Sequence, residues 1–85
     1  MKLKNDLILR QVADTWVVLP LSKEILDFNG MLRLNESGAL LWRAMQEGAD
    51  LVDVLTTEYD VDREQAAADV DAFLNSLRSA GCVED

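Results

Sequence analysis

The stretch from Met31 to Trp42, MLRLNESGALLW, changes from a strand pattern to a helix pattern within two residues. Leu32 and Leu34 alternate with a methionine and an arginine, which is the two-residue period of a pleated strand. Asn35 then suits a helix N-cap, because its side chain can accept a hydrogen bond from an amide of the first turn. The stretch therefore predicts a short strand that runs directly into a capped helix and leaves a strand edge for pairing.

Two further β-rich segments lie upstream, at residues 7–12 and 15–20. The short Ala13-Asp14 step between them is compatible with a turn, so the two segments predict a β-hairpin. Pro20 has no amide hydrogen to donate to a sheet, and the second strand is therefore expected to end there or to lie at an edge.

The connection to the third strand is less determined. Asn29-Gly30 is a strong turn dipeptide, which allows residues 25–28 to form an additional strand paired with residues 31–34. We expect three antiparallel strands, at about 7–12, 15–20 and 31–34, and leave 25–28 open. Residues 82–83 are expected to add a brief strand near the end of the chain.

Three amphipathic segments after the third strand carry their own end signals. Gly48 suits the end of the first segment because glycine tolerates a positive φ angle. Asp50 and Asp62 suit the caps of the second and third, and Gln65 completes a capping-box pattern after Asp62. The expected helices span about 36–47, 51–58 and 63–80. The sequence thus predicts an α+β fold with a winged-helix-like order, three strands followed by three helices.

The third expected helix has two informative faces. Its large apolar residues recur at helical spacing and are expected to enter one core with Trp42 and with Leu32 or Leu34; they are Ala66, Val70, Phe73, Leu74 and Leu77. A second strip has small side chains, with Gln65 and Asp69 beside it; it consists of Ala68, Ala72, Ser76 and Ser79. The strip is either an ordinary solvated face or the wall of a groove that another chain can approach closely.

Composition predicts one compact domain, residues 1–85. Hydrophobic residues make up 49% of the 85 positions, which is enough for a packed interior. The longest apolar runs are only a few residues, and the N-terminus lacks the apolar region of a secretory signal, so we expect neither a membrane span nor secretion. Cys82 is the only cysteine, which excludes an internal disulfide and favours the reducing cytoplasm.

Catalysis by this chain alone is not expected. The sequence contains no histidine, which removes the commonest general base and the commonest metal ligand. Cys82 has no basic partner near it in sequence and is expected to be a small packing residue. We expect a binding protein without a cofactor.

The negative charge is concentrated in the helical part. Residues 1–34 carry a net charge of +1, whereas residues 35–85 carry −9. Such a surface repels phosphate backbones, so nucleic acid is not an expected partner, and a winged-helix DNA-binding regulator is the weaker alternative. A self-associating structural module, whose strand edge pairs with a second copy, stays open as another alternative.

Taken together, the segments resemble the PqqD-like family over nearly the whole chain. The resemblance rests on the order and spacing of short matches rather than on any one of them. These are Leu34-Asn35-Glu36-Ser37-Gly38-Ala39, Trp42, Gly48, Tyr59-Asp60-Val61, Ala68-Asp69-Val70, Phe73-Leu74, Leu77 and Gly81. Members of this family act as recognition elements for ribosomally synthesised, post-translationally modified peptides.

The resemblance implies a mechanism of binding. The leader segment of a precursor peptide adds as a strand beside the third strand and lies between that strand and the third helix, and the chain presents it to a modifying enzyme, with radical SAM enzymes among the candidate classes. The implied contact residues are Met31, Leu32, Arg33, Leu34, Asp69, Ala72, Phe73 and Ser76. A monomer or a weak homodimer is expected.

Two features depart from the family pattern. Cys82 stands where the family often has a larger aliphatic residue, which affects only local packing. The connection over residues 21–30 is longer than in the quinone-pathway proteins, so the resemblance does not assign this chain to the synthesis of that cofactor.

Overall fold

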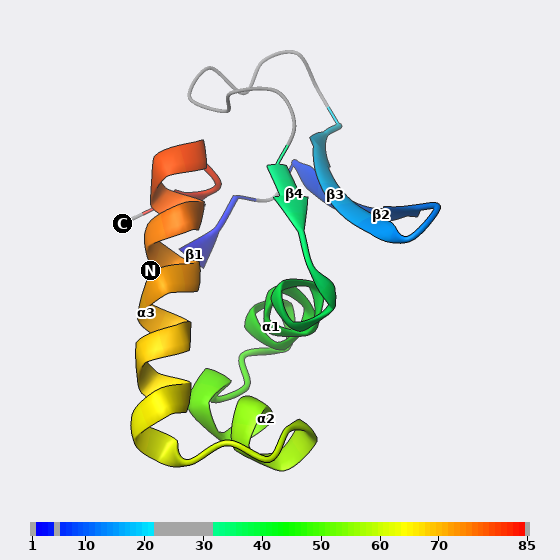
Figure 1. The fold of residues 1–85 in the computed structure, drawn as a ribbon. Coiled ribbons are helices and arrows are strands. Elements are labelled where there is room, and N and C mark those ends of the chain that lie inside the picture. The colour runs from blue at the N-terminus through cyan, green and yellow to red at the C-terminus, as the bar shows by residue number, and fades with distance from the viewer. Residues whose placement is uncertain (1, 5, 22–31, 85) are drawn as a thin grey trace.

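The computed structural model describes residues 2–4, 6–21 and 32–84 (Figure 1). The elements follow the order β1 (Lys2–Leu3), β2 (Leu7–Val12), β3 (Thr15–Pro20), β4 (Leu32–Leu34), α1 (Glu36–Glu47), α2 (Leu51–Glu58), α3 (Arg63–Ala80) and β5 (Val83–Glu84). The α+β, winged-helix-like fold predicted from the sequence, a three-stranded antiparallel sheet followed by three helices, is confirmed. The tentative strand at 25–28 and the first residue of the predicted third strand, Met31, lie outside the described residues.

The main sheet has the order β2-β3-β4, and both pairings are antiparallel. In the hairpin, Val12 lies opposite Thr15, which leaves Ala13 and Asp14 as the loop. Ala13 has a φ angle of 54°, in the left-handed region that such tight hairpin turns require. On the other side of β3, Trp16 lies opposite Leu34, so the register places the end of β4 beside the start of β3.

A second, two-stranded sheet joins the two ends of the chain. Lys2 pairs with Glu84 and Leu3 with Val83, so β1 and β5 run antiparallel. The brief strand expected after the third helix is therefore present, one residue later than predicted. The two-residue strand β1 was not predicted, because nothing in so short a segment distinguishes it from a loop and its partner lies at the far end of the chain.

Helix ends follow the predicted capping residues. Asn35 Oδ1 accepts a hydrogen bond from the Gly38 amide at 2.8 Å, and Asp62 Oδ1 accepts one from the Gln65 amide at 2.8 Å. Gly48 ends α1 with a φ angle of 76°. In a complete capping box, the Gln65 side chain would also bond to the Asp62 amide. Here it donates to Asp69 Oδ1 at 2.9 Å instead, so this second bond is not formed between the described residues Gln65 and Asp62.

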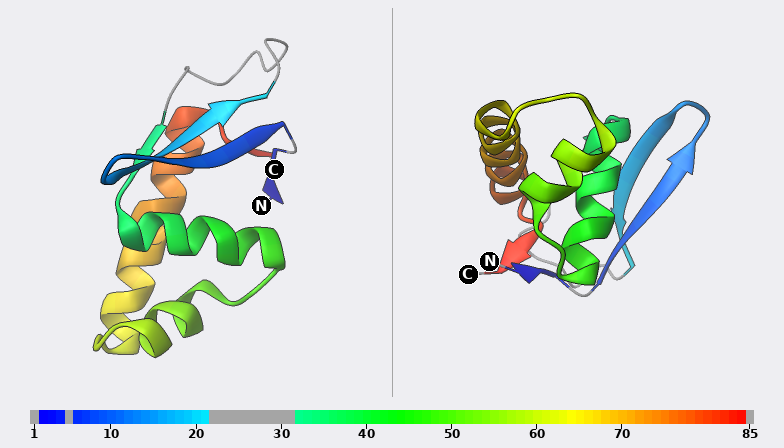
Figure 2. Two further views of the ribbon diagram at one scale, coloured as in Figure 1. Left: turned by 90° about the vertical axis from the view of Figure 1, so that its right-hand side faces the viewer. Right: turned by 90° about the horizontal axis from the view of Figure 1, so that it is seen from below.

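The helices pack in layers against the sheet. In Figure 2, α1 lies between the main sheet and α2, and α3 runs along the side of this stack. Trp42, Leu77 and Val18, from three different elements, are completely or almost completely buried in one core, and Leu34 and Phe73 belong to the same cluster. Leu74 is half-buried and packs against it, so the predicted core grouping is confirmed.

Among the described residues, none of the helices has both the length and the apolar character that crossing a bilayer requires.

Candidate functional site

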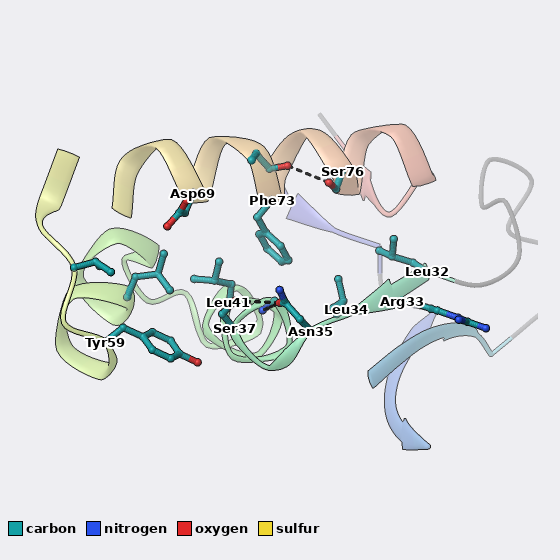
Figure 3. Close-up of a pocket in the computed structure, with 14 residues that line it drawn as sticks. Leu32, Arg33, Leu34, Asn35, Ser37, Leu41, Tyr59, Asp69, Phe73 and Ser76 are labelled. Carbon is teal, nitrogen blue, oxygen red and sulfur yellow. Dashed lines mark hydrogen bonds between the residues drawn. The ribbon is translucent and has the colours of Figure 1, made fainter. Parts of the chain in front are cut away.

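A groove of about 580 Å³ lies between β4 and α3 and is open to solvent (Figure 3). It exists because α1 starts immediately after β4, which turns the chain away from the strand edge, while α3 returns across the same side. Fourteen of the described residues line it: Leu32, Arg33, Leu34, Asn35, Ser37, Gly38, Leu41, Leu55, Tyr59, Val61, Asp69, Ala72, Phe73 and Ser76.

One wall of the groove is the edge of β4. In the part of the chain that the structure describes, β4 has β3 as its one strand neighbour, and its other edge faces α3. Leu34 is buried in the core and Leu32 packs partly against it, whereas Arg33 is exposed and its side chain points away from α3 in Figure 3. Main-chain groups at such an edge can pair with an incoming strand.

The opposite wall is one face of α3. Asp69 precedes Ala72 and Phe73 by three and four residues, and Ser76 follows them by four and three, so the four residues share this face. The Ser76 hydroxyl donates to the Ala72 carbonyl of its own helix at 3.1 Å, so at both positions the wall presents little bulk. Small side chains let another backbone come close to the helix.

The floor of the groove is apolar, and one of its ends is polar. Leu41, Leu55 and Phe73 form part of the buried core beneath the opening. Asp69 and Tyr59 lie at the same end of the groove in Figure 3, and Gln65 holds one carboxylate oxygen of Asp69. The groove thus combines an apolar centre with an acidic end.

The structure places seven of the eight predicted site residues around this single groove; they are Leu32, Arg33, Leu34, Asp69, Ala72, Phe73 and Ser76. Met31 lies outside the described residues. That these side chains contact a peptide stays a prediction. The small-residue strip of α3 is split, because Ala72 and Ser76 line the groove whereas Ala68 and Ser79 do not.

The contributions of α1 and of the segment after α2 to the groove were not predicted from the sequence. Asn35, Ser37 and Gly38 line the groove from the cap and first turn of α1, and Tyr59 and Val61 line it from the segment after α2. The position of Asn35 at the groove could have been predicted from its role as N-cap, because it directly follows the strand that borders the groove and starts the next helix. Tyr59 had no comparable signal, since its position depends on how α2 packs.

Cys82 lies away from the groove, fully buried in the core. Burial raises the pKa of its thiol to about 11, with a small opposing effect from Lys4. The thiol is therefore protonated at neutral pH, as expected of a packing residue rather than a nucleophile.

Comparison with known proteins agrees with this geometry. The family described as Coenzyme PQQ synthesis protein D (PqqD) matches residues 15–83, most of the chain and all of the main sheet except β2. The chain belongs to the PqqD family. The resemblance drawn from its motifs is thereby confirmed, and no match was found among curated proteins.

Two solved structures are similar to this PqqD-family chain. One is TbiB1 in complex with the TbiA(beta) leader peptide, with a TM-score of 0.78 and 26% identity over 99% of this chain and 95% of that one. The other is lasso peptide synthetase B1 complexed with the leader peptide, with a TM-score of 0.77 and 26% identity over 99% of this chain and 96% of that one. Both are nearly whole-chain matches, so the likeness includes the elements that border the groove as well as the sheet.

Proposed function

We propose that this chain binds the leader segment of a ribosomally synthesised precursor peptide, which adds as a strand to the edge of β4 that faces α3. The observation that carries this proposal is the groove in which a strand edge faces a helix wall of small side chains. The similar structures, each of which holds a leader peptide, support it. Seven groove residues, Leu32, Arg33, Leu34, Asp69, Ala72, Phe73 and Ser76, are the proposed contacts, with Met31 as the preceding strand residue.

In the proposed complex, main-chain hydrogen bonds and side-chain contacts contribute to recognition in different ways. Main-chain hydrogen bonds to β4 give affinity with little dependence on sequence. Alternate side chains of the added strand point toward the groove floor, where Leu41 and Phe73 favour apolar residues. Arg33 contributes chiefly through its backbone, since its side chain points the other way.

We further propose that the chain is not a catalyst and that it holds the leader while a separate modifying enzyme acts on the rest of the precursor. Radical SAM enzymes are one candidate class. A groove open to solvent suits this role, because a captured peptide can leave it at either end and reach a second protein.

The test blocks the groove without touching the core. Ala72→Trp fills the opening from an exposed position, and Ala67→Trp is the matched control, equally exposed on α3 but outside the groove lining. Synthetic peptides from short reading frames beside the gene serve as probes, and fluorescence polarisation measures binding. Ala72→Trp is expected to weaken binding by about 30-fold or more, the loss of a central interface contact, while Ala67→Trp stays within about twofold.

Equal binding by both folded variants contradicts the proposed groove. Size-exclusion chromatography over a range of concentrations addresses the self-associating alternative. A dimer that Ala72→Trp disrupts and that no peptide dissociates would assign the β4 edge to a second copy of the chain.

A further inference from the structure

A second cleft, of about 370 Å³, lies on the other side of α1 from the groove, between the β2–β3 hairpin and the end of α2. Leu40, Arg43 and Trp16 form its walls. The guanidinium carbon of Arg43 is 4.4 Å from the centroid of the Trp16 ring, so the one basic side chain among the described residues of the cleft is stacked on its aromatic wall.

The remaining charged groups of this cleft are acidic. Asp14, Glu36 and Glu58 line it from the hairpin loop, the first turn of α1 and the last residue of α2. None of these carboxylates forms an ion pair or side-chain hydrogen bond with another described residue. Three acids around one stacked arginine give the cleft a net negative charge and favour a cationic group inside it.

The cleft and the groove adjoin at Tyr59. This residue lines both cavities, and Glu36 of the cleft stands between Asn35 and Ser37 of the groove. Tyr59 also lies at the same end of the groove as Asp69, across the opening from it (Figure 3). A peptide that follows the groove past Asp69 and crosses Tyr59 therefore passes into the cleft.

We propose that the cleft is a second subsite for the same precursor peptide, and that it takes a lysine or arginine from the residues that flank the strand-forming segment on the Tyr59 side. The inference rests on the proposed function. A long basic side chain suits the cleft because its aliphatic stem packs on Leu40 and Trp16 while its charge reaches Glu36 and Glu58. The chain thus recognises two features of the leader, an apolar segment that forms a strand and a basic residue that flanks it.

The experiment compares two double variants, each of which loses two carboxylates. The probe is a displayed library of random peptides. Peptides are selected on the wild-type chain, and those that Ala72→Trp no longer binds are kept as groove binders. Their affinities are then measured for Glu36→Gln/Glu58→Gln and for the control Glu47→Gln/Asp71→Asn, which removes two carboxylates outside both cavities. Thermal melts confirm that each variant is folded.

Groove binders are expected to carry a basic residue on one flank. The cleft variant should bind them on the order of fivefold more weakly, as for one or two partly exposed ion pairs, and the control within about twofold. Replacing the basic residue by norleucine should abolish the difference between wild type and cleft variant.

Four outcomes overturn the inference. Groove binders without a basic flank, or equal binding by the cleft variant and wild type, refute the second subsite while the proposed function stands. The same holds if the cleft variant weakens only the association with a modifying enzyme. If selection yields no peptide that depends on Ala72, the proposed function fails and the inference falls with it.

Discussion

The two neighbouring faces of α3 differ in what they present. One face buries Val70 and Leu77 in the core, and the next presents Ala72 and Ser76 to an open groove. Phe73 belongs to both, since it is buried in the core cluster and also lines the groove floor. Large buried side chains on this helix therefore determine the stability of the fold, and small exposed ones determine how closely another chain can approach the helix.

The sharpest test of this division is truncation of a side chain that serves only the core. Leu77 is fully buried and does not line the groove. Leu77→Ala is expected to lower the free energy of unfolding by about 2–5 kcal/mol, and Phe73→Ala by about 3–5 kcal/mol, because each leaves a cavity in so small a core. Urea or thermal denaturation followed by circular dichroism measures the loss.

Ala72→Ser serves as the groove-face control and is expected to change stability by less than about 0.5 kcal/mol, as exposed substitutions do. Full thermal stability of Leu77→Ala would show that the core has been assigned to the wrong face of α3.

Two helix caps extend the comparison to single hydrogen bonds. Asn35 and Asp62 each accept one first-turn amide bond of 2.8 Å, but only Asn35 lines the groove. Alanine at either position is expected to cost about 1 kcal/mol of stability. Only Asn35→Ala should also weaken peptide binding, because the start of α1 forms part of the groove. Denaturation and fluorescence polarisation on both variants separate the two effects, and a similar loss of binding in Asp62→Ala would mean that caps act through global stability alone.

The elements of the main sheet and all three helices were predictable because each carries local information. The strand–helix junction at Asn35, the glycine ends and the capping aspartates act within one turn of the chain. The strand β1 could not be predicted, since two residues hold no periodicity and their partner lies about eighty positions away. Residues of the α3 wall followed from helical spacing, whereas Tyr59 depended on the packing of α2.

In the interior, the buried thiol of Cys82 is expected to make the stability of the fold depend on pH. Burial raises the pKa of the Cys82 thiol from its usual 9.0 to about 11. The unfolded chain loses this proton first, so the folded state binds more protons between these values and stability falls as pH rises from about 9 to 11. At pH 10 the expected loss is about 1 kcal/mol.

Denaturation at pH 8 and pH 10 measures this loss, with Cys82→Ala as the control. The variant is less stable at both pH values, but it should lack the part of the pH dependence that the thiol contributes. Identical pH dependence in the variant and the wild type would assign the effect to other groups.

The smallest expected effect concerns the acidic end of the groove. Asp69 is the one carboxylate among the described residues that line the groove, and the Gln65 amide holds it at 2.9 Å. A leader that places a lysine or arginine here gains about 0.2–1 kcal/mol, the range for an exposed ion pair, and the gain is screened by salt. Binding by the wild type should therefore weaken modestly from low to high salt, and Asp69→Asn should flatten that dependence.

Asp71→Asn removes the same charge from an exposed position of α3 outside the groove lining and should keep most of the salt dependence. Gln65→Ala leaves the charge but frees the carboxylate, so it should reduce affinity less than Asp69→Asn does. Titrations at several salt concentrations distinguish a local ion pair from the general acidity of the chain: if Asp69→Asn and Asp71→Asn change the salt dependence equally, the groove reads no charge at Asp69, and its selectivity comes from its apolar floor alone.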